Sequence, residues 1–315
     1  MSTPPLISLI VCTRNRADEL AKTLAALARI QIPPGGAELV IVDNASTDDT
    51  PQVIRQAGLA NLPVRSIEQP LPGLSNARNL GLRAARGEII IFTDDDVRPA
   101  GDWVMELARP LIDRRYHAVV GRVEFPPELA RPWMTNLYTE WLAGVDPCRH
   151  DRPELMGANM AFHRSVLEKV PEFDPELGAG ALGFAEETLF SRQLEQAGFH
   201  LGFAERAVVV HHFGPSRLRR GAWLDAAHQR GQADGYLSYH WLHDEPAGAR
   251  LRWMWWTAKL ALRRLVQPPA PPETEGCAWW EISYVRMRAK FRQIRLERTR
   301  PRNYARLGLV RLNRP

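Results

Sequence analysis

Strand-like and helix-like segments alternate through the first hundred residues, and this alternation limits the possible folds more than any other feature of the chain. Short apolar, β-branched runs are typical of buried strands, whereas apolar residues at helical spacing are typical of helices. The strand-like segments are Leu6–Cys12, Glu38–Asp43, Val64–Ile67 and Glu88–Thr93, and the helix-like segments between them are Ala17–Ile30, Pro51–Ala57 and Asn76–Arg86. A β-α-β-α-β-α-β order predicts an α/β fold with a doubly wound, mostly parallel sheet and helices on both faces.

The remainder of the chain alternates less regularly. Its expected strands are Ala118–Phe125 and Ala207–His211, and Met156–Phe162 is expected to be a short buried element. Its expected helices are Trp103–Ile112, Thr188–Ala197 and the segments near 217–243, 250–266 and 279–297. Residues 126–153 are rich in proline and tryptophan and are expected to be irregular. Four prolines in Gln267–Pro272 predict a linker between the last two helices.

The strand at 88–93 ends in three consecutive carboxylates, Asp94–Asp96. Like charges at the end of a buried strand repel one another and are poorly solvated, so a divalent cation that itself holds a diphosphate would relieve the repulsion. An exposed acidic turn is the simpler alternative. Ligands of doubly wound sheets bind beyond the carboxyl ends of the strands. The same edge is expected to hold Thr13, Arg14 and Asp43.

Composition is ordinary for one large globular domain or one domain with an appendage, since 45% of the 315 residues are hydrophobic and 24% are charged. Cys12, Cys148 and Cys277 lie far apart and form no CxxC pair, so neither a disulfide framework nor a zinc site is expected. Residues 1–5 show no secretory signal, and no run of about 18 apolar residues occurs. The prediction is a cytoplasmic protein without a membrane-spanning helix.

Five short segments, taken in order, resemble the family-2 glycosyltransferases, which are inverting enzymes of GT-A fold that use nucleotide-sugars. The segments are Ser8–Arg16 (SLIVCTRNR), Val42–Thr50 (VDNASTDDT), Gly73–Gly81 (GLSNARNLG), Thr93–Val97 (TDDDV, similar to the DxD motif) and Gly183–Arg192 (GFAEETLFSR). The resemblance covers about residues 6–235. It implies a catalytic domain at 1–245, with a nucleotide-binding half at 1–100 and an acceptor and base half at 101–245. A basic, tryptophan-rich helical extension at 246–315 lies outside the resemblance.

The resemblance implies a nucleotide site in which Asp43 contacts the nucleobase or the ribose. Capping of the next helix is the alternative role, although Thr47 and Asp48 are better placed for it. Asp94 and Asp96 are expected on one side of an extended strip, one for the ribose and one for a metal, with Asp95 facing away or replacing one of them. The expected nucleotide-binding residues are Thr13, Arg14, Asp43, Arg78, Asp94, Asp95 and Arg217.

A hard divalent ion, Mg²⁺ or Mn²⁺, is the expected cofactor of the acidic motif. Its expected ligands are Asp96, Asp94 and His211, which closes the last predicted strand. The adjacent His212 points to the opposite side of the strand, so at most one of the two histidines is a ligand. A histidine that is only hydrogen-bonded is the alternative.

Glu187 is the expected general base, with Glu186 as the second candidate. The base takes the proton of the acceptor hydroxyl during its attack on the anomeric carbon. In the family pattern the second acid of this pair has the role and is often aspartate, so the glutamate here reaches one methylene further. The alternative is that both acids only stabilise the start of the helix at 188–197, where negative charge is favoured.

The resemblance implies transfer of a sugar from a nucleotide-sugar donor to the hydroxyl of a glycan, a lipid-linked acceptor or another molecule. Synthesis of cell-surface polysaccharide, lipopolysaccharide or glycolipid is the expected context. A catalytically inactive GT-A scaffold that binds nucleotide or a partner protein is the alternative. A sugar nucleotidyltransferase is disfavoured because Thr13–Arg16 contains no glycine for a phosphate loop.

Residues 249–315 contain 16 basic and 4 acidic residues, so this segment carries +12 and the rest of the chain −7 of the net charge of +5. Tryptophans and basic residues at helical spacing favour peripheral attachment to the inner face of the plasma membrane, with anionic lipid as the partner. A solvated helical appendage packed on the catalytic domain is the alternative. Nucleic acid is not expected as a partner, because no binding motif is present and the acidic body would repel the backbone.

Overall fold

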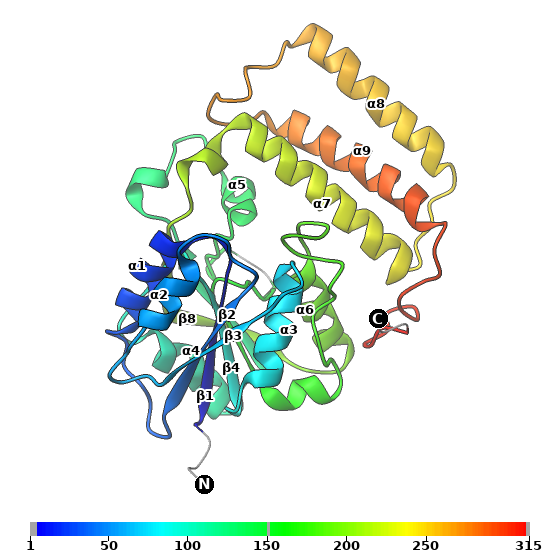
Figure 1. Cartoon of the computed structure of the whole chain (residues 1–315). Helices are drawn as coiled ribbons and strands as arrows, with labels where there is room; N and C mark the ends of the chain where they lie inside the picture. The colour runs from blue at the N-terminus through cyan, green and yellow to red at the C-terminus, as the bar shows by residue number, and fades with distance from the viewer. Residues whose placement is uncertain (1–4, 150–151, 313–315) are drawn as a thin grey trace. The chain divides into compact units, whose positions relative to one another are not determined.

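The computed structural model describes residues 5–149 and 152–312. Sequence predictions that fall on the other positions lie outside the described residues, and they include most of the segment 1–5 that lacks a secretory signal. The fold of the described residues is α/β, with the sheet in the N-terminal two thirds and long helices in the C-terminal third (Figure 1).

The described part of the chain divides into two compact units. The first comprises Met1–Pro175 with Phe190–His212, and the second comprises Glu176–Leu189 with Phe213–Pro315. These units describe packing. The boundary predicted near residue 245 separates an expected catalytic domain from an expected helical extension, so it stays a prediction.

Eight strands form one sheet in the part of the chain that the structure describes, in the order β3-β2-β1-β4-β7-β6-β8-β5. The strands are β1 (Ile7–Thr13), β2 (Ala37–Asp43), β3 (Val64–Glu68), β4 (Ile89–Asp94), β5 (Val97–Pro99), β6 (Ala118–Glu124), β7 (Met160–His163) and β8 (Leu201–His211). The strands β1 to β4 pair in parallel, as do β6 and β8, whereas β5 and β7 are antiparallel to their neighbours. The prediction of a doubly wound, mostly parallel sheet is confirmed.

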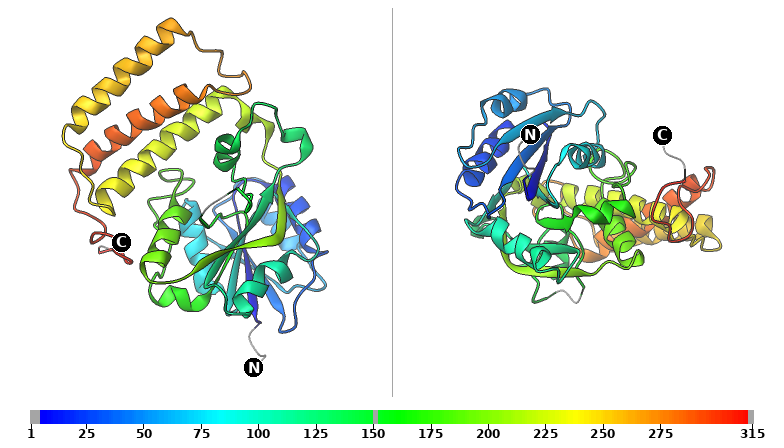
Figure 2. Two further views of the ribbon diagram at one scale, coloured as in Figure 1. Left: turned by 180° about the vertical axis from the view of Figure 1, so that it is seen from behind. Right: turned by 90° about the horizontal axis from the view of Figure 1, so that it is seen from below.

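Helices cover both faces of this sheet (Figure 2). The helices that contact the strands are α1 (Ala17–Leu27), α2 (Thr50–Gln56), α3 (Leu74–Ala84) and α4 (Trp103–Ile112). They are followed along the chain by α5 (Asn136–Trp141) and by α6 (Glu186–Gln196), which begins in the second unit and ends in the first. The helix α1 buries Leu20, Leu24 and Leu27, which its three-to-four-residue spacing places on one face. Gly81 lets α3 approach β1 closely, because a Cβ there would lie 2.7 Å from Ile10 Cγ2.

Two segments differ from the sequence expectation. Residues 126–153 are not wholly irregular, because they contain the 3₁₀ turn Pro127–Leu129 and helix α5, which ends at the buried Trp141. Proline is tolerated at the first position of such a turn because its missing N–H would be unsatisfied there anyway. The strand β8 begins at Leu201 rather than Ala207, and a register shift at Gly121/Arg122 of β6 interrupts the pairing. Such a bulge breaks the alternation by which strands are recognised in a sequence.

The second unit is built on three long helices, α7 (Arg220–His240), α8 (Ala249–Val266) and α9 (Trp279–Glu297). They run side by side, with α9 packed against both of the others (Figures 1 and 2). Gly231 and Gly235 let α7 and α9 approach closely, since added Cβ atoms would lie 2.1 Å from Arg286 O and 2.6 Å from Lys290 O.

Buried ion pairs fix the long helices to one another. Glu281 of α9 accepts from Arg220 Nη2 at 2.5 Å and from Arg264 Nε at 2.7 Å. Glu297 lies 3.0 Å from His240 Nε2 of α7. Both carboxylates are 2% exposed, so the acidic side chains of α9 face the interior of the unit. Among the described helices, none combines the length and the apolar character that crossing a bilayer requires.

Candidate active site

The acidic motif lies at the carboxyl edge of the sheet, where β4 ends at Asp94 and β5 begins at Val97. Asp95 and Asp96 form a tight turn between the two strands, so the expected extended strip is wrong. The turn directs Asp95 and Asp96 inward, where they are 5% and 4% exposed, while the side chain of Asp94 keeps 34% of its exposure. Three carboxylates therefore converge on one edge, two of them buried.

Arg16 neutralises the two buried carboxylates. Its Nε lies 3.0 Å from Asp95 Oδ1 and its Nη2 lies 2.5 Å from Asp96 Oδ2, and Thr13 Oγ1 donates to Asp95 Oδ2 at 2.7 Å. Burial raises the pKa of Asp95 to about 7, although Arg16 and Thr13 act against this rise. The same carboxylates raise the pKa of Arg16 against the effect of its own burial. The Asp95 carboxylate and the Arg16 guanidinium thus each favour the charged form of the other.

Arg16 is a site residue that the sequence reasoning missed, while it named the neighbouring Arg14. Arg14 is exposed, and Arg16 reaches the acidic turn from just before α1. The signal in the sequence was the need for a counter-charge to three consecutive acids at the end of a buried strand, together with the position of Arg16 beyond a strand end. Thr13, which was predicted, lies at the site through its hydrogen bond to Asp95.

His211 reaches Asp96 because the end of β8 pairs with β5, with Val97 opposite His211. His211 Nε2 lies 3.3 Å from Asp96 Oδ1, and its Nδ1 lies 3.0 Å from the carbonyl oxygen of Leu142. Since a carbonyl only accepts, Nδ1 must carry the proton and donate it. In the neutral ring, Nε2 then points a lone pair at a carboxylate oxygen. Two acceptors in this arrangement need a proton or a cation between them.

Arg78 is a second cation at the acidic motif. Its side chain is buried on α3, and its Nη2 lies 3.9 Å from Asp94 Oδ1. The guanidinium also lies 5.9 Å from the ring centre of Phe92 and 5.5 Å from that of Phe173, which hold it in place. Adjacent Asn79 fixes the same helix by exchanging two hydrogen bonds of 2.8 Å with the backbone of Phe173.

Asp43 ends β2 directly beside Thr13 of β1. One oxygen of its buried carboxylate accepts a hydrogen bond from the Ser46 backbone at 3.0 Å, so Asp43 orders its own turn. Asn44 holds the adjacent loop, because its side chain donates to the carbonyls of Gln69 and Leu71 and accepts from Gly73 N. The turn at the end of β2 is thus ordered by hydrogen bonds within the chain.

Glu186, Glu187 and Arg217 lie in the second unit and are described apart from the acidic motif. Glu186 and Glu187 form the first turn of α6. Glu186 is buried against Gly178, where a Cβ would lie 2.9 Å from its Cδ, whereas Glu187 is half-buried. Arg217 is exposed in the 3₁₀ turn Pro215–Leu218, and its guanidinium lies 5.6 Å from the ring centre of Phe213.

Asp96 and His211 are the side chains that fit a divalent metal best. Among the described residues, no group of three or more histidine, cysteine or acidic side chains is arranged to chelate an ion. Mg²⁺ and related ions are commonly held by one or two protein ligands together with substrate phosphates and water. An oxygen and an imidazole nitrogen suit Mn²⁺. The Asp96 carboxylate and the His211 imidazole, 3.3 Å apart, are close enough to bind one ion together.

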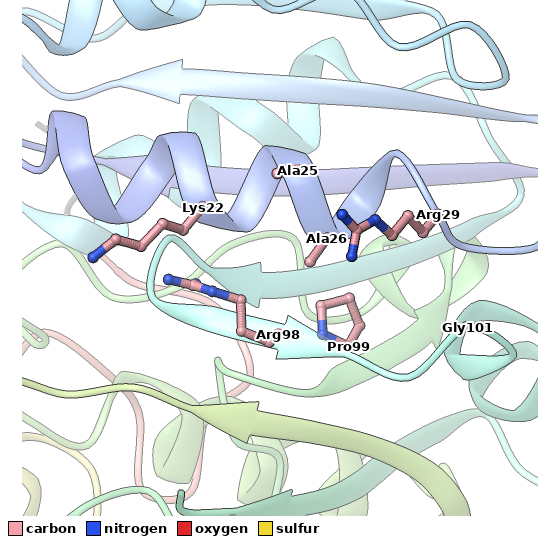
Figure 3. Close-up of a pocket in the computed structure, with 7 residues that line it drawn as sticks. All are labelled: Lys22, Ala25, Ala26, Arg29, Arg98, Pro99 and Gly101. Carbon is pink, nitrogen blue, oxygen red and sulfur yellow. The ribbon is translucent and has the colours of Figure 1, made fainter.

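A surface cavity of about 500 Å³ lies between α1 and β5 and is lined by residues of both segments (Figure 3). Its lining includes the basic side chains Lys22, Arg29 and Arg98. Lys22 and Arg98 both pair with Glu19, at 2.7 and 2.8 Å, so this one carboxylate balances one of their two charges. None of the acidic-motif residues lines this cavity.

The model of the family described as glycosyl transferase family 2 matches residues 8–171, which is just over half of the chain. The chain therefore belongs to glycosyl transferase family 2. The matched residues include β1 from Ser8 onward, the acidic motif and Arg78.

Two curated relatives are similar over most of their length. Glycosyltransferase AglE of Haloferax volcanii is 27% identical over 214 residues, which cover 67% of this chain and 68% of AglE. Succinoglycan biosynthesis protein ExoM of Rhizobium meliloti is 28% identical over 257 residues, 78% of each chain.

Solved structures show the same fold. Mannosyltransferase PcManGT from Pyrobaculum calidifontis, in complex with GDP-Man and Mn²⁺, matches with a TM-score of 0.62 and 21% identity over 94% of this chain and 88% of that one. TarS 1–349 of S. aureus, in complex with UDP, matches with a TM-score of 0.50 and 17% identity over 93% and 91%. The architecture is that of the GT-A glycosyltransferases, with C-terminal helices following the sheet.

Proposed function

We propose that the chain is a metal-dependent, inverting glycosyltransferase that moves a sugar from a nucleotide-diphosphate sugar to an acceptor hydroxyl. The observation that carries the proposal is the acidic turn at the carboxyl edge of the sheet, where Asp96 faces His211 and Arg78 approaches Asp94. A donor diphosphate brings negative charge, and a cation at Asp96 with the guanidinium of Arg78 would receive it.

Each part of the donor is proposed to bind particular side chains of the chain. Asp43 accepts hydrogen bonds from the nucleobase or ribose, and Asp94 contacts the ribose. Asp96 and His211 hold Mn²⁺ or Mg²⁺, which would stabilise charge on the departing nucleoside diphosphate. Arg78 is proposed to contact the diphosphate, and Arg217 is a second candidate for that role.

Glu187 is proposed to take the proton of the acceptor hydroxyl. The hydroxyl oxygen forms a bond to the anomeric carbon, the bond from that carbon to the diphosphate oxygen breaks, and the electron pair leaves with the diphosphate. The anomeric configuration is inverted by this single displacement. Glu186, which is buried beside Gly178, is proposed to position the turn that carries Glu187.

Support for the substrate classes comes from the relatives. PcManGT was solved with GDP-Man and TarS with UDP, and ExoM takes part in succinoglycan biosynthesis. A nucleoside-diphosphate sugar is therefore the proposed donor, and a glycan or lipid-linked hydroxyl the proposed acceptor, in the synthesis of a cell-surface polysaccharide, lipopolysaccharide or glycolipid. Work at the inner face of the plasma membrane, through residues 249–315, is part of the same proposal.

Release of nucleoside diphosphate from a panel of sugar nucleotides tests the proposal. Release is expected with Mn²⁺ present, and EDTA is expected to stop it reversibly. Asp96→Asn and His211→Asn are expected to lower the rate at least about a hundredfold. The control is His212→Asn, because His212 lies next to His211 but just beyond the end of β8. Nucleotide binding without release from any donor would favour the inactive scaffold instead.

A further inference from the structure

The helix α8 has two different faces. One face packs on α9, with Ala249 and Leu260 buried and with Trp253 and Trp256 against the cluster of Ala249, Phe291 and Ile294. The other face is exposed and apolar. It comprises Leu251 (70% exposed), Met254 (49%), Trp255 (53%), Leu262 (63%), Leu265 (79%) and Val266 (79%). Steps of three, four and seven residues, with the exposed Ala258 between, place these side chains in one stripe along the helix.

Basic side chains border this apolar stripe. The helix contains Arg250, Arg252, Lys259, Arg263 and Arg264 and no acidic residue. Aromatic rings hold several of these cations in place. Lys259 Nζ lies 4.6 Å from the ring centre of Trp255 and 4.7 Å from that of Tyr284, and the Arg263 guanidinium lies 5.4 Å from the ring centre of Trp280. The positive charges are thus fixed beside the stripe rather than free in solvent.

The neighbouring helix neutralises only one of these five cations, because Glu281 pairs with Arg264 at 2.6 Å. Its two acidic side chains, Glu281 and Glu297, are buried and face Arg220, Arg264 and His240. The exposed surface of α8 therefore combines an apolar centre with cationic borders, and the acids that could have screened it point inward.

A large exposed apolar stripe with charged borders marks an interaction surface. A second copy of this chain would bring the same cations against those of the first, so repulsion opposes a dimer on this face. An anionic bilayer complements both features, because acyl chains accept the apolar stripe and phosphate headgroups accept the cations. Five charges within 18 residues exclude crossing of the membrane.

We propose that α8 lies in the surface of an anionic lipid bilayer, with the stripe of Leu251, Trp255, Leu262 and Leu265 inserted below the headgroups. This inference deepens the membrane attachment in the proposed function by naming the element, its inserted face and the lipid class. Trp253 and Trp256 take no part in insertion, because they pack against the α9 cluster.

Flotation of the full chain with lipid vesicles tests the proposal. Vesicles of phosphatidylcholine with phosphatidylglycerol are expected to carry the protein, and vesicles of phosphatidylcholine alone to carry at least about tenfold less. The double substitution Leu251→Ser with Leu262→Ser is expected to lower partitioning at least about tenfold. The matched control is Leu71→Ser, an equally exposed leucine (65%) in the first unit, which is expected to change nothing. Equal flotation of the double variant and the wild type overturns the proposal.

Fluorescence quenching and self-association distinguish bilayer insertion from dimer formation. Brominated lipids are expected to quench the tryptophan fluorescence of the wild type more than that of Trp255→Phe, and equal quenching contradicts insertion of this face. Loss of self-association in the double variant, without vesicle binding by the wild type, assigns the stripe to a second copy and overturns the proposal.

Diphosphate release without vesicles distinguishes this inference from the proposed enzyme. A chain that floats but releases no diphosphate contradicts the enzyme alone. A chain that releases diphosphate but does not float contradicts the anchor alone.

Discussion

At the scale of single residues, the acidic motif is a problem of charge balance. Asp94, Asp95 and Asp96 bring three carboxylates, and Arg16 and Arg78 bring two guanidiniums to them. A tight cluster of this kind is stable only if each buried carboxylate is paired with a positive charge. Arg16 matches Asp95 and Asp96 together, so it contacts the same carboxylate that would hold a metal.

Replacement of Arg16 by glutamine is expected to strengthen Mn²⁺ binding in the absence of nucleotide. The guanidinium and the ion share the Asp96 carboxylate as a partner, so removing one cation favours the other. A rise in affinity of about fivefold or more is expected, and isothermal titration with Mn²⁺ measures it.

The control for this experiment is Arg14→Gln, since Arg14 is exposed and lies two positions away. Thermal melting of both variants confirms that they fold. If Mn²⁺ binds Arg16→Gln no better than the wild type, Arg16 and the metal do not compete for Asp96.

At the scale of secondary-structure elements, the second unit depends on the close approach of α7 and α9. A Cβ at Gly231 would lie 2.1 Å from Arg286 O and 2.7 Å from Ala289 Cβ, which is closer than atoms can pack. The helices would have to separate to admit even one methyl group. Glycine at this position therefore sets the distance between the two helices.

Gly231→Ala is expected to lower the free energy of unfolding by about 3 kcal/mol, because overpacking outweighs the better helix propensity of alanine. Urea unfolding monitored by circular dichroism measures the change. Gly221→Ala in the same helix is the matched control, since a Cβ there meets Pro272 O at an ordinary 3.4 Å. This control is expected to be neutral or stabilising by up to about 1 kcal/mol. Equal stability of the two variants would contradict the close helix contact.

A second feature of this unit is pH-dependent. Glu176 accepts hydrogen bonds from Arg300, Asn303 and Arg311, which ties the C-terminal segment to the start of the unit. Burial acts to raise the pKa of Glu176, but these donors outweigh it and lower the pKa from 4.5 to about 2. A carboxylate whose pKa is lower in the folded state stabilises the fold above its unfolded pKa and loses this contribution as the pH falls.

Stability is therefore expected to fall between about pH 4.5 and pH 2 through Glu176. In Glu176→Gln this part of the fall is expected to be absent, and the variant is expected to be roughly 1–2 kcal/mol less stable than the wild type at pH 7, because the partner Arg300 is partly exposed. Urea unfolding across this pH range gives the slopes. Parallel pH profiles for the two proteins would show that Glu176 does not contribute.

At the scale of the whole molecule, the sequence predicted the sheet because strand and helix patterns alternate in chain order. The position of Asp94 at a carboxyl edge follows from that order alone. The contacts that Asp96 makes could not be predicted from the order of the elements. The turn after β4 brings Asp96 to Arg16, and the antiparallel pairing of β5 with β8 brings His211 to Asp96. Such contacts depend on tertiary geometry rather than on local pattern.

The tryptophans of α8 show the same limit. The sequence placed them together as residues of a membrane interface. The structure divides them, since Trp253 and Trp256 pack on α9 and Trp255 is exposed. Helical spacing predicted an amphipathic helix, but only the position of α9 shows which face is left uncovered.

The general base is the last functional role that a substitution can test. Glu187 lies in the first turn of α6, and Glu186 beside it is buried against Gly178. If Glu187 takes the acceptor proton, Glu187→Gln keeps the shape of the side chain and removes only its basicity. The turnover number is then expected to fall about 10² to 10⁴-fold, while donor affinity is unchanged. Glu195→Gln, at an exposed position of the same helix, is the control.

Donor binding by calorimetry and diphosphate release in the presence of acceptor provide the two measurements. A weaker donor affinity with unchanged turnover would move Glu187 to the donor site. Normal turnover would mean that the two acids only stabilise the N-terminus of α6, where negative charge is favoured in any protein. A loss of turnover in Glu186→Gln that accompanies a lower melting temperature would instead mark Glu186 as a positioning residue, because its buried carboxyl fills the space beside Gly178. The two acids are thus expected to have different roles: Glu187 takes the proton, and Glu186 positions Glu187.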